Sequence, residues 1–194
     1  MFLTTAVNAQ TDTAYYIPIK WLTWQEAMTL NAFSPKKVFV FVETDSNQYC
    51  HKMDTVTFQD SIVKYYLNSG YYPVKLNAQS KDTIFYKGYN LIYREMPDTN
   101  IGYHDLARGI LESNLIFPGI VIFDEEMLRL KILHGYINPN VISGWLAYYW
   151  HNEHLKKNPI NFGAGMNYQC NDPNHPHNRL RNLDKQMQNS DKNW

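Results

Sequence analysis

The sequence predicts an α/β protein of three layers, with helices on both faces of a central mixed sheet. Two observations indicate this class. A strand, a helical region and a second strand follow one another within residues 38–76, and such a crossover favours parallel strands. Alternating apolar segments at residues 120–133 then predict an antiparallel hairpin before a closing helix. Apolar periodicity ends near His154, so we predict an irregular C-terminal tail over residues 155–194.

The composition is that of one domain with extensions. The chain has 194 residues, 44% of them hydrophobic, and we assign the domain to residues 11–154. Eighteen basic and 18 acidic residues cancel, which argues against a nucleic-acid or anionic-membrane partner. Fifteen tyrosines and five tryptophans exceed what a core of this size needs. We therefore expect some aromatic rings on a surface that meets a partner.

The N-terminus resembles the end of a secretory signal. Residues 1–10 are apolar or small, and Val7-Asn8-Ala9 precedes Gln10 as a cleavage site would. We expect a signal-peptide remnant here, and hence an exported protein of the periplasm or another part of the cell envelope. Further along, the sequence has no uninterrupted apolar run of the length that a membrane-spanning helix needs, so we predict no transmembrane segment.

The first half of the chain alternates helices and strands. Residues 15–19 predict an extended edge segment, because Pro18 cannot donate to a ladder. Thr23 and Glu26 form a capping-box pair for a helix over residues 24–33. The run Val38-Phe39-Val40-Phe41-Val42 predicts a strand buried on both faces.

Two more helices and a strand follow. Asn47 is a predicted N-cap that places Cys50 in the first turn of a helix, and residues 54–57 break that helix. Asp60 starts the next helix, which stops at Asn68-Ser69-Gly70 before a strand at residues 71–76.

The second half begins with an excursion from the sheet. Residues 82–95 alternate around Lys87-Gly88, which predicts a hairpin, and residues 103–114 predict a helix. Strands at residues 120–123 and 128–133 form the terminal hairpin. The last helix starts at Asn138, with Pro139 at its first position.

Several segments together carry a family resemblance over residues 20–152. These are Lys37-Val38-Phe39-Val40-Phe41-Val42-Glu43-Thr44-Asp45, Cys50-His51-Lys52-Met53-Asp54, Thr57-Phe58, Tyr72-Pro73-Val74-Lys75-Leu76-Asn77, Phe117-Pro118 and Gly135-Tyr136. In order and spacing the chain resembles the thioredoxin superfamily, in particular exported thioredoxin-like proteins of Bacteroidota, and is similar to the C-terminal domain of the disulfide reductase DsbD. The resemblance implies a thioredoxin-like fold.

The chain departs from the redox motif of that family. The family reads Trp-Cys-x-x-Cys where this chain has Ser46 at the tryptophan and Asn47 at the attacking cysteine, so only Cys50 matches a thiol. Phe41 stands where many thioredoxins carry a buried aspartate. The family chemistry needs the first thiolate to attack a substrate disulfide. The CxxC motif is therefore degenerate, and we expect a binding protein more than an enzyme.

The resemblance implies that the peptide-binding surface of the family is retained. Pro118 matches the family's cis-proline, and the backbone of the preceding Phe117 would pair with an extended peptide. The predicted binding residues are Asn47, Gln48, Tyr49, Phe117 and Pro118. We expect a protein or peptide partner, either alone or within a larger envelope assembly, and no cofactor.

Three interpretations of Cys50 stay open. It is a buried relic, or it forms a disulfide with Cys170 that holds the tail over the site, or it is the catalytic thiol of an oxidoreductase, with or without Cys170 as the second thiol. The segment from Cys170 to His177 has zinc-ligand types, but its spacing matches no standard set. We therefore predict no metal site.

Overall fold

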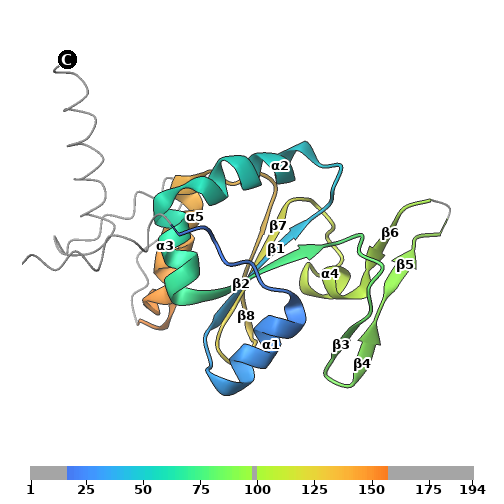
Figure 1. The fold of residues 1–194 in the computed structure, drawn as a ribbon, viewed down its shortest axis with the longest axis horizontal. Helices are drawn as coiled ribbons and strands as arrows, with labels where there is room; N and C mark the ends of the chain where they lie inside the picture. The colour runs from blue at the N-terminus through green and yellow to red at the C-terminus, as the bar shows by residue number, and fades with distance from the viewer. Residues whose placement is uncertain (1–16, 98–99, 157–194) are drawn as a thin grey trace, which may run out of the picture.

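A computed structural model of the chain describes residues 17–97 and 100–156 (Figure 1). The predicted signal remnant, Cys170 and most of the predicted tail lie outside the described residues, as does the run from Cys170 to His177.

A four-stranded mixed sheet forms the centre of the fold, in the order β2-β1-β7-β8. Strand β1 (Lys37–Glu43) pairs in parallel with β2 (Tyr71–Asn77) and antiparallel with β7 (Gly119–Phe123). Strand β8 (Arg129–His134) completes the terminal antiparallel hairpin. The predicted mixed sheet is confirmed. Strand β1 is one of its two inner strands, and its β-branched and aromatic residues are buried on both faces.

Helices cover both faces of the sheet. Within the described residues these are five α-helices and two 3-10 turns: α1 (Trp24–Phe33), α2 (Gln48–Thr55), η3 (Thr57–Gln59), α3 (Ser61–Gly70), α4 (Asp105–Ile110), α5 (Pro139–Trp150) and η4 (Glu153–Leu155). One core lies between the sheet and α2, α3 and α5, where Phe39 and Phe41 of β1 point. The other lies under α1 and α4, where Val38, Val40 and Val42 point. Helices α3 and α5 lie side by side (Figure 1).

Side-chain caps start α1, α2, α3 and α5 where the sequence predicts. Thr23 and Glu26 form both bonds of the capping box of α1. The side chains of Asn47, Asp60 and Asn138 accept backbone N–H groups at the starts of α2, α3 and α5. Each cap satisfies donors that a helix leaves unpaired at its first turn, so local sequence fixes these boundaries.

The excursion between β2 and α4 differs from its prediction. Strand β3 (Ile84–Tyr86) pairs with β4 (Tyr89–Leu91) around Lys87-Gly88, whose φ values of 49° and 86° suit a tight hairpin turn. A second hairpin follows, in which β5 (Tyr93–Glu95) pairs with β6 (Gly102–His104). The prediction of one hairpin over residues 82–95 was therefore wrong in extent. Figure 1 shows both hairpins projecting from the same side of the sheet.

The predicted helix over residues 103–114 is also too long. Helix α4 starts only at Asp105, because Nδ1 of His104 accepts the N–H of Leu106 and makes His104 its N-cap. It ends at Ile110, and Glu112 and Ser113 then take left-handed backbone conformations.

The segment that pairs with the β2 edge of the sheet lies further along the chain than predicted. Residues 17–19, the described part of the expected edge segment, form no strand. Instead Leu22 bridges to the edge strand β2: its N–H donates to the Pro73 carbonyl at 2.8 Å, and its carbonyl accepts from the Lys75 N–H at 3.2 Å. Pro18 does not take part in the bridge.

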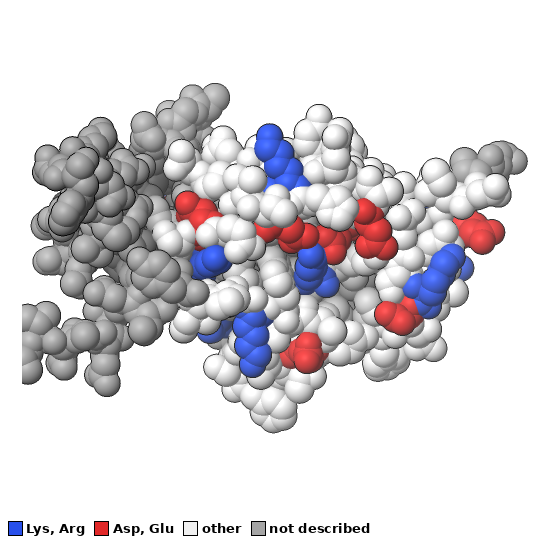
Figure 2. Space-filling model, turned by 45° about the horizontal axis from the view of Figure 1, so that its top comes forward, with Lys and Arg blue, Asp and Glu red and all other residues white. Residues whose placement is uncertain are grey.

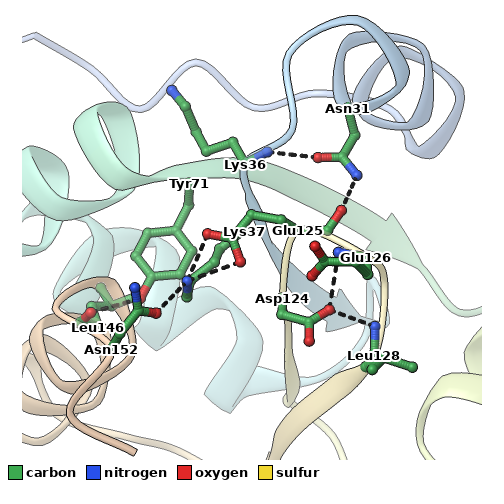
Figure 3. Close-up of polar contacts among 10 residues, drawn as sticks. All are labelled: Asn31, Lys36, Lys37, Tyr71, Asp124, Glu125, Glu126, Leu128, Leu146 and Asn152. Atoms are coloured by element: carbon green, nitrogen blue, oxygen red, sulfur yellow. Dashed lines mark hydrogen bonds and ion pairs between the residues drawn. The ribbon is translucent and has the colours of Figure 1, made fainter. Parts of the chain in front are cut away.

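A buried polar network fastens the end of β1 that lies far from α2 (Figure 3). The ammonium group of Lys37, a residue only 3% exposed, donates to both carboxylate oxygens of Glu125 at 2.7 and 3.0 Å. It also donates to Oδ1 of Asn152 at 2.8 Å. The network thereby joins the start of β1 to the β7–β8 turn and to the segment after α5.

Candidate functional site

Asn47 closes the turn between β1 and α2. Its backbone N–H donates to the Thr44 carbonyl at 3.2 Å, and its side-chain Oδ1 accepts from the N–H groups of Tyr49 at 2.8 Å and Cys50 at 3.2 Å. Asn47, the residue that the sequence resemblance aligns with the attacking cysteine, is thus the cap of α2. An amide has no nucleophilic thiol, and here its oxygen is committed to the backbone.

The other half of the same carboxamide reaches the Phe117–Pro118 loop. Nδ2 of Asn47 donates to the carbonyl oxygen of Phe117 at 3.2 Å, and the peptide bond that follows that carbonyl is cis. The structure therefore brings together Asn47 and Phe117, two of the predicted binding residues. Pro118 is buried, and its carbonyl accepts from the Gly135 N–H at 2.8 Å, so its side chain offers little surface.

Aromatic and apolar side chains surround this junction. Tyr49 is 49% exposed and Ile116 is 52% exposed, while Gln48 is exposed at the start of α2. The ring of Tyr103, from β6, lies 5.4 Å from the ring of Phe117. Sequence reasoning missed Tyr103 because it placed this residue in a helix. The second hairpin thus forms a wall beside the loop.

Cys50 is enclosed in the core beneath α2. It is 1% exposed and belongs to the cluster that contains Met53, Phe41 and Phe58. Burial raises the pKa of the thiol, and the carboxylates of Glu43 and Asp54 add to that rise, although a hydrogen bond with the Thr44 backbone opposes it. Among the described residues the thiol forms no disulfide. It lacks both the exposure and the lowered pKa of a reactive thiolate.

Phe41 belongs to the same core cluster as Cys50. It is fully buried, and its ring centroid lies 4.8 Å from that of Phe58 in an edge-on contact. Nζ of Lys75 lies 5.8 Å from the centroid of the same ring. The residue expected to remove the family's proton acceptor therefore has a packing role.

A lysine with two carboxylates lies next to this core. Nζ of Lys75 is 2.7 Å from Oδ2 of Asp54 and 3.3 Å from Oε2 of Glu43. Burial raises the pKa of Glu43, against the nearby charge of Lys75. Asp45 is exposed in the following turn, where its carboxylate accepts from the Asn77 amide at 3.0 Å. Figure 2 shows a row of acidic side chains crossing the middle of the face seen there. The sequence feature that could have revealed this cluster is Lys75, a lysine within the largely apolar strand β2.

Two further kinds of feature were expected to be absent from the chain. Within residues 17–97 and 100–156, no three His, Cys, Asp or Glu side chains are grouped to hold a metal ion. Among the same residues, no helix combines the length and apolarity needed to cross a membrane.

Comparisons with known proteins agree with this architecture. A family model, Thioredox_DsbH, described as a protein of unknown function, DUF255, matches residues 7–94, a range that includes the start of α2 but not Phe117. A thioredoxin from Thermus thermophilus is 16% identical, with a TM-score of 0.51 over 69% of this chain and 88% of its own. That likeness shows a thioredoxin-like fold.

Two further solved structures are similar at lower TM-scores. One described as DsbH oxidoreductase is 15% identical, with a TM-score of 0.48 over 77% of this chain and 95% of its own. The reduced C-terminal domain of DsbD from Neisseria meningitidis is 16% identical, with a TM-score of 0.41 over 63% of this chain and 90% of its own. No curated protein matches the sequence.

Proposed function

We propose that this protein is a thioredoxin-fold binding protein that has lost thiol–disulfide exchange and that receives an extended protein or peptide segment beside Asn47 and Phe117. The observation that carries the proposal is the carboxamide of Asn47. It occupies the nucleophile position and is hydrogen-bonded on one side to the start of α2 and on the other to Phe117.

The remaining thiol is poorly suited to exchange. Attack on a disulfide requires a thiolate that can approach the sulfur atom of a substrate. Cys50 is 1% exposed, and its pKa is raised by burial, so both the fraction of thiolate and its access to a substrate are low. Two neighbouring carboxylates, Glu43 and Asp54, disfavour a further negative charge there.

The same junction keeps what peptide binding needs. The N–H of Phe117 has no hydrogen-bond partner among the described residues, and Phe117 itself is only partly buried. An unpaired backbone group can add an extended peptide by strand-like pairing. Tyr49, Ile116 and Tyr103 supply the apolar and aromatic contact surface around it.

We place this function in the cell envelope. Support comes from residues 1–10, which resemble the end of a secretory signal, and from the resemblance to exported thioredoxin-like proteins of Bacteroidota. Fractionation of cells that express the full-length gene tests this location. Recovery of the protein only with cytoplasmic markers would refute it.

An insulin-reduction assay tests the loss of exchange. The wild-type protein and Cys50→Ser should both run at the uncatalysed rate of dithiothreitol alone. Asn47→Cys recreates a Cys-x-x-Cys sequence at the start of α2 and is the matched gain-of-function variant. Wild-type turnover above background that Cys50→Ser abolishes would show instead an oxidoreductase that uses Cys50.

A further inference from the structure

The backbone of Phe117 is asymmetric in its hydrogen bonding. Its carbonyl oxygen accepts from Nδ2 of Asn47 at 3.2 Å, whereas its N–H has no partner among the described residues. The donor is thus unpaired within the described residues, whereas the acceptor is partly used by the protein itself. This asymmetry has a consequence for the segment that binds there, provided that the proposed function holds.

A peptide residue placed opposite Phe117 in an antiparallel pairing would normally exchange two hydrogen bonds with it. Here the peptide carbonyl can accept from the free N–H, but the peptide N–H meets an oxygen that already has one donor. Only its second lone pair remains. The C=O of the peptide residue at this position therefore contributes more to binding than its N–H does. Proline is the residue that accepts without donating.

The surface around Phe117 suits a proline ring. The rings of Tyr103 and Phe117 lie 5.4 Å apart, and Tyr49 is half exposed at the start of α2. Aromatic-lined surfaces recognise proline-containing segments because these segments are already extended and lose little conformational entropy on binding. The same contacts would hold other apolar side chains, so the backbone asymmetry is what singles out proline.

The charge beside the junction adds a second requirement. Glu43, Asp54 and Asp45 contribute three carboxylates, and the ammonium group of Lys75 bonds to two of them. Asp45 lies two residues before Asn47 and is exposed. A segment with a basic side chain near its bound residue would complement this negative charge.

From these features we infer that the partner is an extended segment with a proline opposite Phe117 and a basic residue close by. In this inference Asn47 determines specificity: by occupying the Phe117 carbonyl, it removes the disadvantage that proline has in a strand-like pairing.

Peptide titrations of the full-length protein test this inference. The probes are short capped peptides of valine and lysine whose central residue is alanine, N-methylalanine or proline. N-methylalanine carries a methyl group in place of the alanine N–H, so the change in the affinity ratio of this pair between two protein variants isolates the hydrogen bond. The dissociation constants are measured for the wild type and for Asn47→Ser, because serine can still cap α2 but is too short to replace the amide donor.

The wild type should bind the alanine and N-methylalanine peptides with nearly equal affinity, and the proline peptide at least as well. In Asn47→Ser the Phe117 carbonyl is free, so alanine should be preferred over N-methylalanine by about two- to tenfold, the range of one net hydrogen bond. Peptides with glutamate in place of lysine should bind more weakly to both proteins.

The outcomes separate the inference from the proposed function. If the wild type prefers alanine by the same factor as Asn47→Ser, Asn47 has no part in the selection and the inference is overturned, while peptide binding stands. If none of the peptides binds to either protein, the proposed binding function itself fails. A preference for the glutamate peptides would overturn only the inference that the bound segment carries a basic residue.

Discussion

Replacing Asn47 by alanine removes three hydrogen bonds at once. Two are the capping bonds to the Tyr49 and Cys50 N–H groups, and the third joins α2 to the Phe117 carbonyl. Loss of an asparagine N-cap costs about 1 kcal/mol, and loss of one net hydrogen bond costs about 1 kcal/mol more. We therefore expect Asn47→Ala to lower the free energy of unfolding by about 2 kcal/mol.

Asn47→Ser separates these two contributions. Serine retains a capping oxygen for α2 but cannot reach Phe117, so its cost should be about 1 kcal/mol. Urea unfolding of the two variants and the wild type provides the comparison, and the midpoint should shift without a change in slope. If Asn47→Ser were as stable as the wild type, the bond to Phe117 would contribute nothing and the link between the two loops would be refuted.

Other predictions concern the far end of β1 and the second hairpin. Glu125→Gln leaves the buried Lys37 ammonium without its carboxylate, which should cost about 2–3 kcal/mol at neutral pH. Burial raises the pKa of Glu125, but the hydrogen bonds from Lys37 outweigh burial and hold this pKa below its ordinary value of 4.5. The wild-type free energy of unfolding should therefore decrease as the pH is lowered below about 4.5. Urea unfolding at several pH values should show a smaller decrease for Glu125→Gln. An added Cβ at Gly102 would clash with the Arg94 carbonyl oxygen, so Gly102→Ala should raise hydrogen exchange in the second hairpin, whereas Gly109→Ala, with open space around it, should not. Equal exchange in the two glycine variants, or an unchanged pH dependence in Glu125→Gln, would contradict these expectations.

The sequence could predict the features that depend on neighbouring residues. The run from Val38 to Val42 indicates a buried strand because five β-branched or aromatic residues follow one another. Thr23, Asn47 and Asp60 were identified as caps because each needs only donors two or three residues ahead.

Features that depend on distant residues could not be read in this way. The second hairpin pairs two strands of three residues each, too short for a periodic signal, so Tyr103 was placed in a helix. Asn47 and Phe117, which are joined by a hydrogen bond, are 70 positions apart in the sequence, and Lys37 and Glu125 are 88 positions apart. The cap of a helix depends on residues that are near in the sequence, whereas the tertiary partner of a side chain depends on the register of the sheet.

The central claim is that the thiol of Cys50 takes no part in thiol–disulfide exchange. The alkylation rate of Cys50 tests this claim most directly. The folded protein is treated with iodoacetamide near neutral pH, and the Cys50 peptide is quantified by mass spectrometry against the same reaction in denaturant. Because Cys50 is 1% exposed and its pKa is raised above 9.0, native alkylation should be at least about 100-fold slower than in the unfolded chain. A native rate equal to or faster than the unfolded rate would mean that the thiol is open and activated, and would contradict the loss of exchange.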